Sequence, residues 1–219
     1  MSLPTARPRD GEGPVAPSHY FDASPAARSA PRRVRLDLPD LALELLTDRG
    51  VFSAERVDPG TKLLLLDGGR PPAEGRLLDL GCGYGPIAVA AARRSPAAEV
   101  WALDVNERAR SLCAANAAAA GAANVIVAAP DDPRLPGLAF DRIYSNPPIR
   151  VGKAALHELL ERWLDRLSPQ GWATLVVHRQ LGADSLADWL AGRGWPTTRI
   201  ASRAGYRLLQ VAPHAEEGR

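Results

Sequence analysis

The sequence predicts an α/β fold with a mostly parallel sheet and helices on both of its faces. From residue 76 onward, apolar strands alternate with helical segments, which is the pattern of parallel strands joined by crossover helices. A glycine-rich turn follows the first of these strands, as is common where an α/β sheet binds a nucleotide-like ligand. Strands are expected at 76–80, 98–104, 124–129, 139–145, 172–178, 198–203 and 206–212, and helices at 86–96, 106–121, 154–167 and 184–193.

The helix expected at 154–167 has the clearest periodicity in the chain. Its large apolar residues recur at i, i+3, i+4, i+7, i+8 and i+11, so they form a single stripe that faces a core. Pro169 and Gly171 are expected to end this helix. The stripe consists of Leu156, Leu159, Leu160, Trp163, Leu164 and Leu167.

The chain is predicted to have four parts. Residues 1–17 are rich in proline, glycine and charge, so they cannot bury enough apolar surface to offset the entropy of ordering, and we expect a disordered tail. Residues 18–70 contain short apolar runs between turn signals and form a small β-rich appendage. Residues 71–212 carry the alternating pattern of the main domain, and residues 213–219 form a flexible polar tail.

Charge and cysteine content argue against several classes of site. The net charge of +2 over 219 residues does not by itself indicate nucleic-acid binding. Cys82 and Cys113 lack CxxC spacing and the four histidines show no ligand spacing, so no disulfide framework and no metal site are predicted. A basic cluster near the N-terminus is either a solvated surface strip or an RNA phosphate contact, and it comprises Arg28, Arg32, Arg33 and Arg35.

Targeting signals are not evident in the chain. No apolar run approaches the roughly 18 residues that a membrane-spanning helix needs. The first 17 residues also lack the apolar core of a secretion signal. We therefore expect a cytoplasmic protein that does not contact a membrane.

The glycine turn at residues 79–85 is the first candidate binding site. Gly81 and Gly83 allow a tight turn and a close backbone approach to a ligand. Asp79 lies before them, where a carboxylate can hold the ammonium end of an amino-acid-bearing cofactor but would repel a phosphate. NAD is the rival ligand, but the GxGxxG spacing and a Walker A loop are both absent. Cys82 and Tyr84 complete the predicted cradle.

Acidic residues at the ends of the next two strands extend this site. Asp104 ends the second strand, where it can accept hydrogen bonds from two ribose hydroxyls. Val105 lies beside the same ligand, and Asn106 either contacts it or only caps the next helix. Asp131 and Asp132 follow the third strand and are either adenine contacts or members of a plain turn.

Asn146-Pro147-Pro148, after the fourth strand, is the candidate catalytic turn. An exocyclic amine on a purine is a poor nucleophile, because its lone pair is delocalised into the ring. The Asn146 side-chain oxygen and the Pro147 carbonyl can accept its two hydrogens and direct the lone pair toward a methyl donor. The prolines stiffen the turn, so this geometry is set in advance. Together with the glycine turn, this predicts methyl transfer from S-adenosylmethionine to a planar amine.

Three residues beyond the turn are candidates for substrate binding. Ile149 can pack on one face of a target ring, although an aromatic side chain there would stack more specifically. Arg150 and Lys153 are either solvated charges at a helix start or contacts to substrate phosphate or guanine edges.

Three segments resemble a known family. LLDLGCGYG (77–85), ALDVNERA (102–109) and FDRIYSNPPIRVGK (140–153) are similar to class I S-adenosylmethionine-dependent methyltransferases of the "methyltransferase small" group. The resemblance is to RsmC-type ribosomal RNA guanine exocyclic-amine methyltransferases and their short single-domain relatives. It extends over residues 18–212, because TDRGVFS (47–53) and DPGTKLLL (58–65) also look like that family.

The resemblance implies a specific architecture and a cofactor. The fold would be Rossmann-like, with seven strands in the order 3-2-1-4-5-7-6 and the last strand antiparallel. S-adenosylmethionine would be the cofactor, and Phe52 would sit over the mouth of the cofactor or substrate site. The turn of this family usually ends in an aromatic residue, and Ile149 departs from that pattern as the short relatives do.

The leading hypothesis is methylation of the exocyclic amine of a guanine in small-subunit (16S) rRNA, with the base unpaired or flipped into the pocket. Its partner would be rRNA or the small ribosomal subunit. One alternative is the same chemistry on a small molecule or a protein amide. Another is a non-catalytic cofactor-binding or RNA-binding module. The sequence leaves the oligomeric state and the exact nucleotide open.

Overall fold

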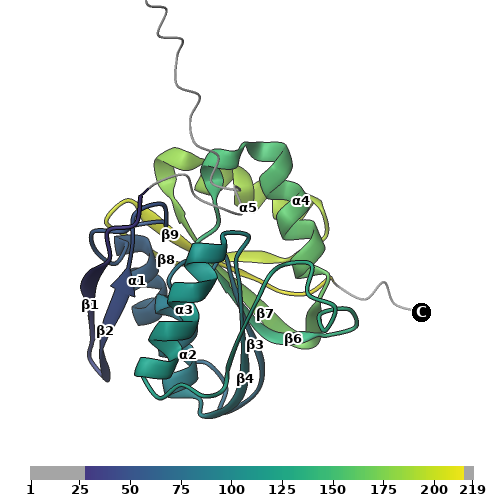
Figure 1. Cartoon of the computed structure of the whole chain (residues 1–219). Helices are drawn as coiled ribbons and strands as arrows, with labels where there is room; N and C mark the ends of the chain where they lie inside the picture. The colour runs from purple at the N-terminus through teal and green to yellow at the C-terminus, as the bar shows by residue number, and fades with distance from the viewer. Residues whose placement is uncertain (1–27, 215–219) are drawn as a thin grey trace, which may run out of the picture.

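The structure is a computed structural model that describes residues 28–214, and a seven-stranded sheet forms its centre (Figure 1). The sheet order is β5-β4-β3-β6-β7-β9-β8, in which β9 is antiparallel to both of its neighbours. Counted from β3, this order is the expected 3-2-1-4-5-7-6, so the predicted fold class is confirmed. The strands are β3 (Glu74–Leu80), β4 (Ala97–Leu103), β5 (Val125–Ala128), β6 (Phe140–Ser145), β7 (Leu167–His178), β8 (Thr197–Arg203) and β9 (Tyr206–Val211).

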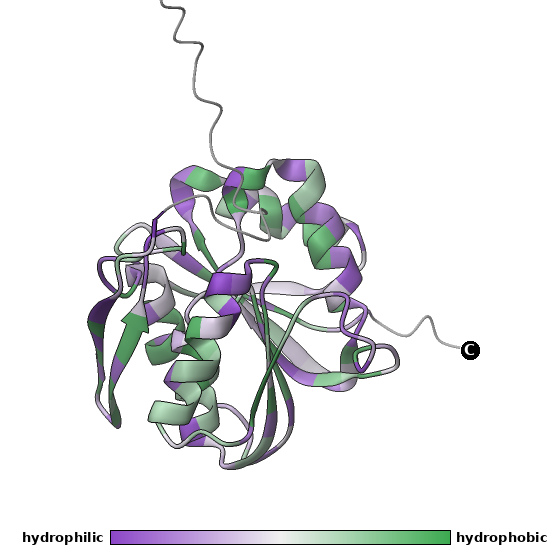
Figure 2. Ribbon diagram, in the orientation of Figure 1, coloured by the Kyte–Doolittle hydropathy of each residue, from purple (hydrophilic) through white to green (hydrophobic). Residues whose placement is uncertain are grey.

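Helices cover both faces of the sheet, as predicted (Figure 1). One face carries α1 (Pro59–Asp67), α2 (Pro86–Arg94) and α3 (Glu107–Ala119), and its buried side chains form one hydrophobic cluster. The other face carries α4 (Lys153–Leu164) and α5 (Ala183–Gly192), which enclose a second cluster. In Figure 2, α4 and α5 alternate between hydrophobic and hydrophilic residues, as expected for helices with one buried side.

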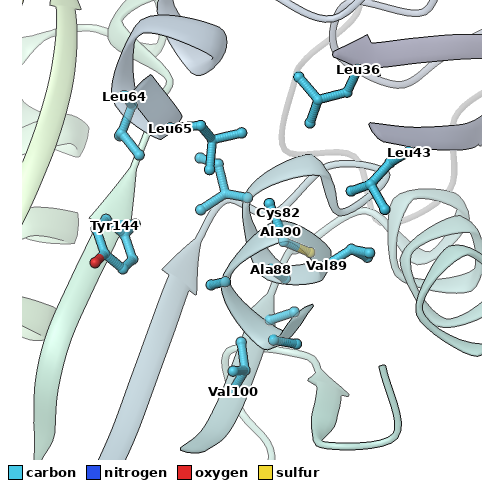
Figure 3. Packing of buried hydrophobic residues seen from close by; sticks show 14 of the residues in the cluster. Leu36, Leu43, Leu64, Leu65, Cys82, Ala88, Val89, Ala90, Val100 and Tyr144 are labelled. Carbon is cyan, nitrogen blue, oxygen red and sulfur yellow. The ribbon is translucent and has the colours of Figure 1, made fainter. Parts of the chain in front are cut away.

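A two-stranded antiparallel ribbon precedes α1 and packs on the first cluster. It consists of β1 (Arg32–Leu38) and β2 (Leu41–Thr47), whose alternate residues are buried. Leu36 and Leu43 point from this ribbon toward α2, as Figure 3 shows. Exposed arginines at the start of β1 alternate with buried aliphatic residues, so the ribbon includes charged residues as well as the apolar runs.

Two arginines of the N-terminal basic cluster, Arg33 and Arg35, lie on the outer face of the ribbon, opposite the buried Val34 and Leu36. Arg33 forms an ion pair with Glu44 across the strands, and Arg35 binds Asp37 at 2.7 Å. Both arginine side chains are exposed, so these pairs contribute little to stability.

The predicted C-terminal boundary of the helix at 154–167 was wrong. Helix α4 ends at Leu164, and Leu167 already belongs to β7. The reason is strand pairing: the Phe140 N–H donates to the Arg166 carbonyl at 2.8 Å, and Leu167 aligns with Phe140 of β6. Leu167 is buried as its apolar character requires, but in the sheet and not on the helix.

None of the helices that the structure describes is long and apolar enough to cross a membrane. Within residues 28–214, no group of three or more His, Cys, Asp or Glu side chains is arranged to hold a metal ion.

Candidate active site

The glycine turn and the Asn-Pro-Pro turn lie side by side at the carboxyl edge of the sheet. Strands β3 and β6 are adjacent and parallel, and Leu80 aligns with Ser145 at their ends. The Ser145 hydroxyl donates a hydrogen bond to the Leu80 carbonyl at 2.7 Å, in the buried interior. The two turns therefore begin at the same level, and one cavity is lined by residues of both.

This cavity is lined by Phe52, Asp58, Thr61, Gly81, Gly83 and Asn146, among other residues. Gly81 and Gly83 have φ angles of 78° and 55°, which few residues other than glycine adopt. A Cβ atom built on either glycine would meet nothing within 4 Å. The backbone of the turn is thus open to close approach by a ligand. Cys82 and Tyr84 line the same cavity and are buried.

Asp79 carries a buried carboxylate that is only half satisfied. Its Oδ2 accepts a hydrogen bond from the Ala88 N–H at 2.9 Å, whereas no partner for its Oδ1 is found among the described residues. Burial, with a smaller contribution from the nearby Asp104 carboxylate, raises the pKa of Asp79 to about 8. An ammonium group beside Oδ1 would donate a hydrogen bond to that oxygen, and its positive charge would stabilise the ionised form of the buried carboxylate. This site therefore fits the amino-acid end of S-adenosylmethionine.

Asp104 is held firmly by the backbone around it. Its two oxygens accept hydrogen bonds from the Gly83 and Asn106 N–H groups, each at 2.9 Å. Burial raises the pKa of Asp104, and the two N–H donors oppose that shift. Each oxygen keeps a further lone pair, so the carboxylate can still accept from two hydroxyls.

Asn106 and Val105 follow Asp104 and link the site to other elements. The Asn106 side chain caps α3 through the Ala109 N–H at 3.2 Å and donates to the Gly50 carbonyl at 2.8 Å. The Val105 carbonyl accepts from Arg110 at 2.8 Å. Capping is therefore visible for Asn106, and a contact from it or from Val105 to a cofactor stays a prediction.

Asp131 and Asp132 follow β5 and do not line the cavity between the two turns. Asp131 is exposed. The Arg134 guanidinium binds both oxygens of Asp132, at 2.9 and 2.8 Å, and holds the pKa of Asp132 at about 2. A contact from either residue to adenine stays a prediction.

The Asn146 carboxamide is fixed by residues of the N-terminal segment. Its Nδ2 donates to Asp58 Oδ2 at 2.9 Å and to Thr61 Oγ1 at 3.0 Å. A carboxylate can only accept hydrogen bonds, so the nitrogen must face Asp58 and the carboxamide oxygen points the other way. The same Asp58 oxygen accepts from the Thr61 N–H at 2.9 Å and so caps α1.

Asp58 and Thr61 are site residues that the sequence analysis missed. In the sequence, Asp58-Pro59-Gly60 is one of the turn signals of the N-terminal appendage. An N-cap aspartate followed by proline at the first helical position also marks the start of a helix, and this signal locates α1. No local pattern indicates that α1 begins against Asn146.

The Pro147 carbonyl is only partly available for its predicted role. Its carbonyl, expected to accept an amine hydrogen, already accepts the Ile149 N–H at 2.8 Å within the short 3-10 turn at Ile149–Val151. One lone pair of this carbonyl remains available. Pro148 begins the same turn, and its carbonyl accepts the Val151 N–H at 3.2 Å.

The predicted substrate residues lie in two places. Phe52 is 44% exposed and lines the cavity, next to the glycine turn. Ile149 packs against the hydrophobic cluster on the α4 side, whereas Arg150 and Lys153 are exposed. None of the last three residues lines the cavity, so Phe52 is the one predicted substrate contact that the structure brings to it.

The sheet order and the paired turns define a class of protein. This topology, with a glycine turn after β3 and a buried acid after β4, is that of class I S-adenosylmethionine-dependent methyltransferases. The Methyltransferase small domain family matches residues 42–210, and the chain belongs to this family. Its cofactor is S-adenosylmethionine.

Similar proteins extend over most of the chain. The uncharacterized protein YbxB of Bacillus subtilis (strain 168) is 31% identical over 195 residues, which are 88% of this chain and 97% of that protein. Ribosomal RNA small subunit methyltransferase C of Pseudomonas aeruginosa (strain LESB58) is 33% identical over 86% of this chain. The match covers 57% of the Pseudomonas protein, so the chain spans little more than half of that relative's length.

A solved structure with the same fold also contains ligands. It is the T. thermophilus 16S rRNA N2 G1207 methyltransferase (RsmC) in complex with AdoMet and guanosine. The TM-score is 0.68 and the sequence identity 26%, over 87% of this chain and 52% of that one.

Proposed function

We propose that this protein transfers a methyl group from S-adenosylmethionine to the exocyclic amine of a guanine in small-subunit rRNA. The observation that carries the proposal is the position of the Asn146 carboxamide. Asp58 and Thr61 hold it beside a glycine turn whose buried Asp79 lacks a partner for one oxygen. An oriented amide and an ammonium site on neighbouring strands are the two parts that this reaction requires.

The cofactor half of the site would use the buried acids. Asp79 Oδ1 would accept from the cofactor ammonium, and Asp104 would accept from the ribose hydroxyls. Gly81 and Gly83 would let the ligand lie against the backbone. Contacts from Cys82, Tyr84, Val105, Asn106, Asp131 and Asp132 are part of the same proposal.

The amine half of the site acts by positioning. When bound, S-adenosylmethionine supplies an electrophilic methyl group on a positively charged sulfur. Asn146 Oδ1 would accept one amine hydrogen, and the remaining lone pair of the Pro147 carbonyl would accept the other. This would direct the nitrogen lone pair out of the ring plane and toward the methyl group. As the nitrogen–carbon bond forms, the bond from carbon to sulfur would break and leave a neutral thioether, and the methylated nitrogen would lose its extra proton to water. No strongly basic side chain is needed, and Pro148 keeps the turn rigid.

Guanine in rRNA is the proposed substrate because similar proteins are rRNA methyltransferases. The T. thermophilus enzyme is a 16S rRNA guanine methyltransferase bound to guanosine, and the Pseudomonas relative is a small-subunit rRNA methyltransferase. In this proposal Phe52 and Ile149 pack against the target base, and Arg150 and Lys153 contact the RNA around it.

A labelling experiment tests the substrate class. The purified protein is incubated with methyl-labelled S-adenosylmethionine and, in parallel, with naked small-subunit rRNA, assembled small subunits, total protein and a small-metabolite extract. We expect label in guanine of rRNA, incorporated at least about a hundredfold more slowly with Asn146→Ala. Label confined to small molecules or to protein would contradict the rRNA assignment, and labelling that is equal with Asn146→Ala would contradict the site.

A further inference from the structure

A second cavity lies at the end of the β8–β9 hairpin. It has a volume of about 390 Å³ and is lined by Arg179, Arg203 and Arg207, together with Ser202, Gly205 and Tyr206. Three guanidinium groups around one concave surface form a concentration of positive charge, which the net charge of +2 does not reveal. None of these arginines has a part in the methyl-transfer site described above.

The hairpin end lies at the same edge of the sheet as the catalytic turn. His178 at the end of β7 aligns with Tyr206, and Tyr206 aligns with Arg203 at the end of β8. β9 is two strands from β6, and the hairpin turns about three residues beyond the level of Asn146, so strand spacing and rise place its end roughly 14 Å from Asn146. An RNA strand whose guanine enters the site would therefore pass close to it.

Tyr206 connects the end of the β8–β9 hairpin to the turn that holds Asn146. Its hydroxyl donates to Asp58 Oδ1 at 3.5 Å, and Asp58 holds Asn146. Its ring packs edge-on against His178, with 4.9 Å between the ring centroids. The position of the hairpin is thus fixed relative to the Asn146 carboxamide.

The three arginines differ in how far their charge is neutralised. The Arg207 side chain is 16% exposed and bound to Asp184 at 3.0 Å, and Asp184 also faces Arg199 at 3.8 Å. Arg203 is 69% exposed, and the carboxylate nearest to it, that of Asp67, is 4.0 Å away. Arg179 is exposed, and within residues 28–214 no carboxylate lies within ion-pair distance of it. Arg179 and Arg203 therefore retain charge that a ligand can use.

We infer that Arg179 and Arg203 bind backbone phosphates of the RNA next to the target guanine, an inference that rests on the proposed function. Guanidinium groups bind phosphate oxygens through paired hydrogen bonds, and such contacts position RNA without reading its sequence. Arg207, neutralised by Asp184, holds the hairpin in place. The hairpin end is then the surface that aligns the strand while the base occupies the site.

The test is RNA binding measured as a function of salt. Binding of a fluorescent single-stranded RNA that the wild type methylates is measured by anisotropy at several KCl concentrations. For single strands, each phosphate contact contributes about 0.7 to the slope of log K against log salt. Arg179→Ala with Arg203→Ala should therefore lower the slope by about 1.4 and raise the KM for RNA. The affinity for S-adenosylmethionine and the kcat at saturating RNA should not change.

Two variants serve as controls. Arg70 is also highly exposed and lies 4.0 Å from its nearest carboxylate, that of Asp40, but it precedes β3 at the opposite edge of the sheet. Arg70→Ala should leave the slope unchanged. Arg203→Lys keeps the charge and should keep most of the slope.

The outcomes separate this inference from the proposed function. If the wild type methylates the RNA while the double variant keeps the wild-type slope and KM, the inference is overturned and the proposed function stands. The same holds if Arg203→Lys lowers the salt slope as much as Arg203→Ala does, because the role of the residue would not then be electrostatic. If the wild type neither binds nor methylates any RNA, the proposed function fails first, and the inference falls with it.

Discussion

The cofactor half and the amine half of the site stand on neighbouring strands but are held in different ways. Around β3, the buried carboxylate of Asp79 lacks a partner for one oxygen, and the glycine turn has open space next to Gly81 and Gly83. Around β6, both hydrogens of the Asn146 amide are already bound by Asp58 and Thr61. The first half needs the charge of a ligand to be satisfied, whereas the second is organised by the protein itself. Substitutions in the two halves should therefore have separable effects.

The largest effect is expected from removing the amide. Asn146→Ala should lower kcat roughly a hundredfold to a thousandfold, because one oriented hydrogen-bonding group at the reacting atom is lost. The Kd for S-adenosylmethionine, measured by calorimetry, should stay within about threefold of the wild-type value, since Asp79 and Asp104 are unchanged. A parallel loss of binding and turnover would contradict the division of the site into two halves.

Asp79 should control cofactor affinity through a proton. Because the pKa of Asp79 is raised to about 8, the free protein carries this proton at pH 7 and must release it when the ammonium binds. The affinity should fall about tenfold per pH unit below 8, and should also weaken above pH 8 as the cofactor amine loses its own proton near its usual pKa of about 8.

Asp79→Asn is the matched variant for this dependence. It should weaken binding at pH 8 by roughly tenfold to a hundredfold, the range for a hydrogen bond to a charged group. The substitution should also make the affinity for S-adenosylmethionine independent of pH below 8. Calorimetry in buffers of different ionisation enthalpy measures the released proton, and a wild-type affinity that does not change between pH 6 and 8 would refute the role of Asp79.

Asp58 is expected to act on Asn146 and not on the cofactor. Asp58→Ser keeps an oxygen that can cap α1 but is too short to bind Asn146 as well, so kcat should fall about tenfold. Asp58→Asn, which keeps the length but not the charge, should lie between this variant and the wild type. The Kd for cofactor and the thermal midpoint report on binding and folding. Unchanged turnover in both variants would show that the bond to Asp58 does not position the amide.

The smallest effect is expected at the contact between the two halves. Ser145→Ala removes the buried hydrogen bond to Leu80 and should lower the free energy of unfolding by about 1–2 kcal/mol, measured by urea denaturation. Ser185→Ala removes a similar bond at the exposed start of α5 and should cost only a few tenths of a kcal/mol. Equal costs would mean that the Ser145 bond does not tie β6 to β3 more strongly than a surface bond does.

The difference between the cofactor half and the amine half also explains how much of the site the sequence could predict. The glycine turn, Asp79 and Asp104 belong to consecutive strands and turns, so local patterns place them together and predict the fold class. The strand order, in contrast, was implied by the resemblance to a known family. Asn146 could also be singled out, because a strand leads directly into Pro147 and Pro148. Its partners could not, since Asp58 and Thr61 precede it by more than eighty residues and approach it only through the packing of α1.

Long-range pairing also accounts for the local errors. Leu167 continues the helical stripe in sequence, but its alignment with Phe140 places it in β7. The Pro147 carbonyl was expected to be free for substrate, and the tight turn that follows it uses one of its lone pairs. The arginines of the hairpin gather only because β7, β8 and β9 are neighbours in the sheet. In each case the missing information lies in tertiary contacts, which residue periodicity does not encode.

The central claim is that a methyl group reaches the exocyclic nitrogen of guanine beside Asn146. The most direct measurement is mass spectrometry of nucleosides from rRNA methylated by the purified protein, with synthetic standards for each methylated guanosine. N2-methylguanosine should be the product, and Asn146→Ala should form it at least about a hundredfold more slowly. A methyl group on a ring nitrogen or on a ribose oxygen would contradict the claim, because neither atom carries the two amine hydrogens that this turn is arranged to accept. A methyl group on the exocyclic amine of adenine or cytosine would contradict the assignment to guanine.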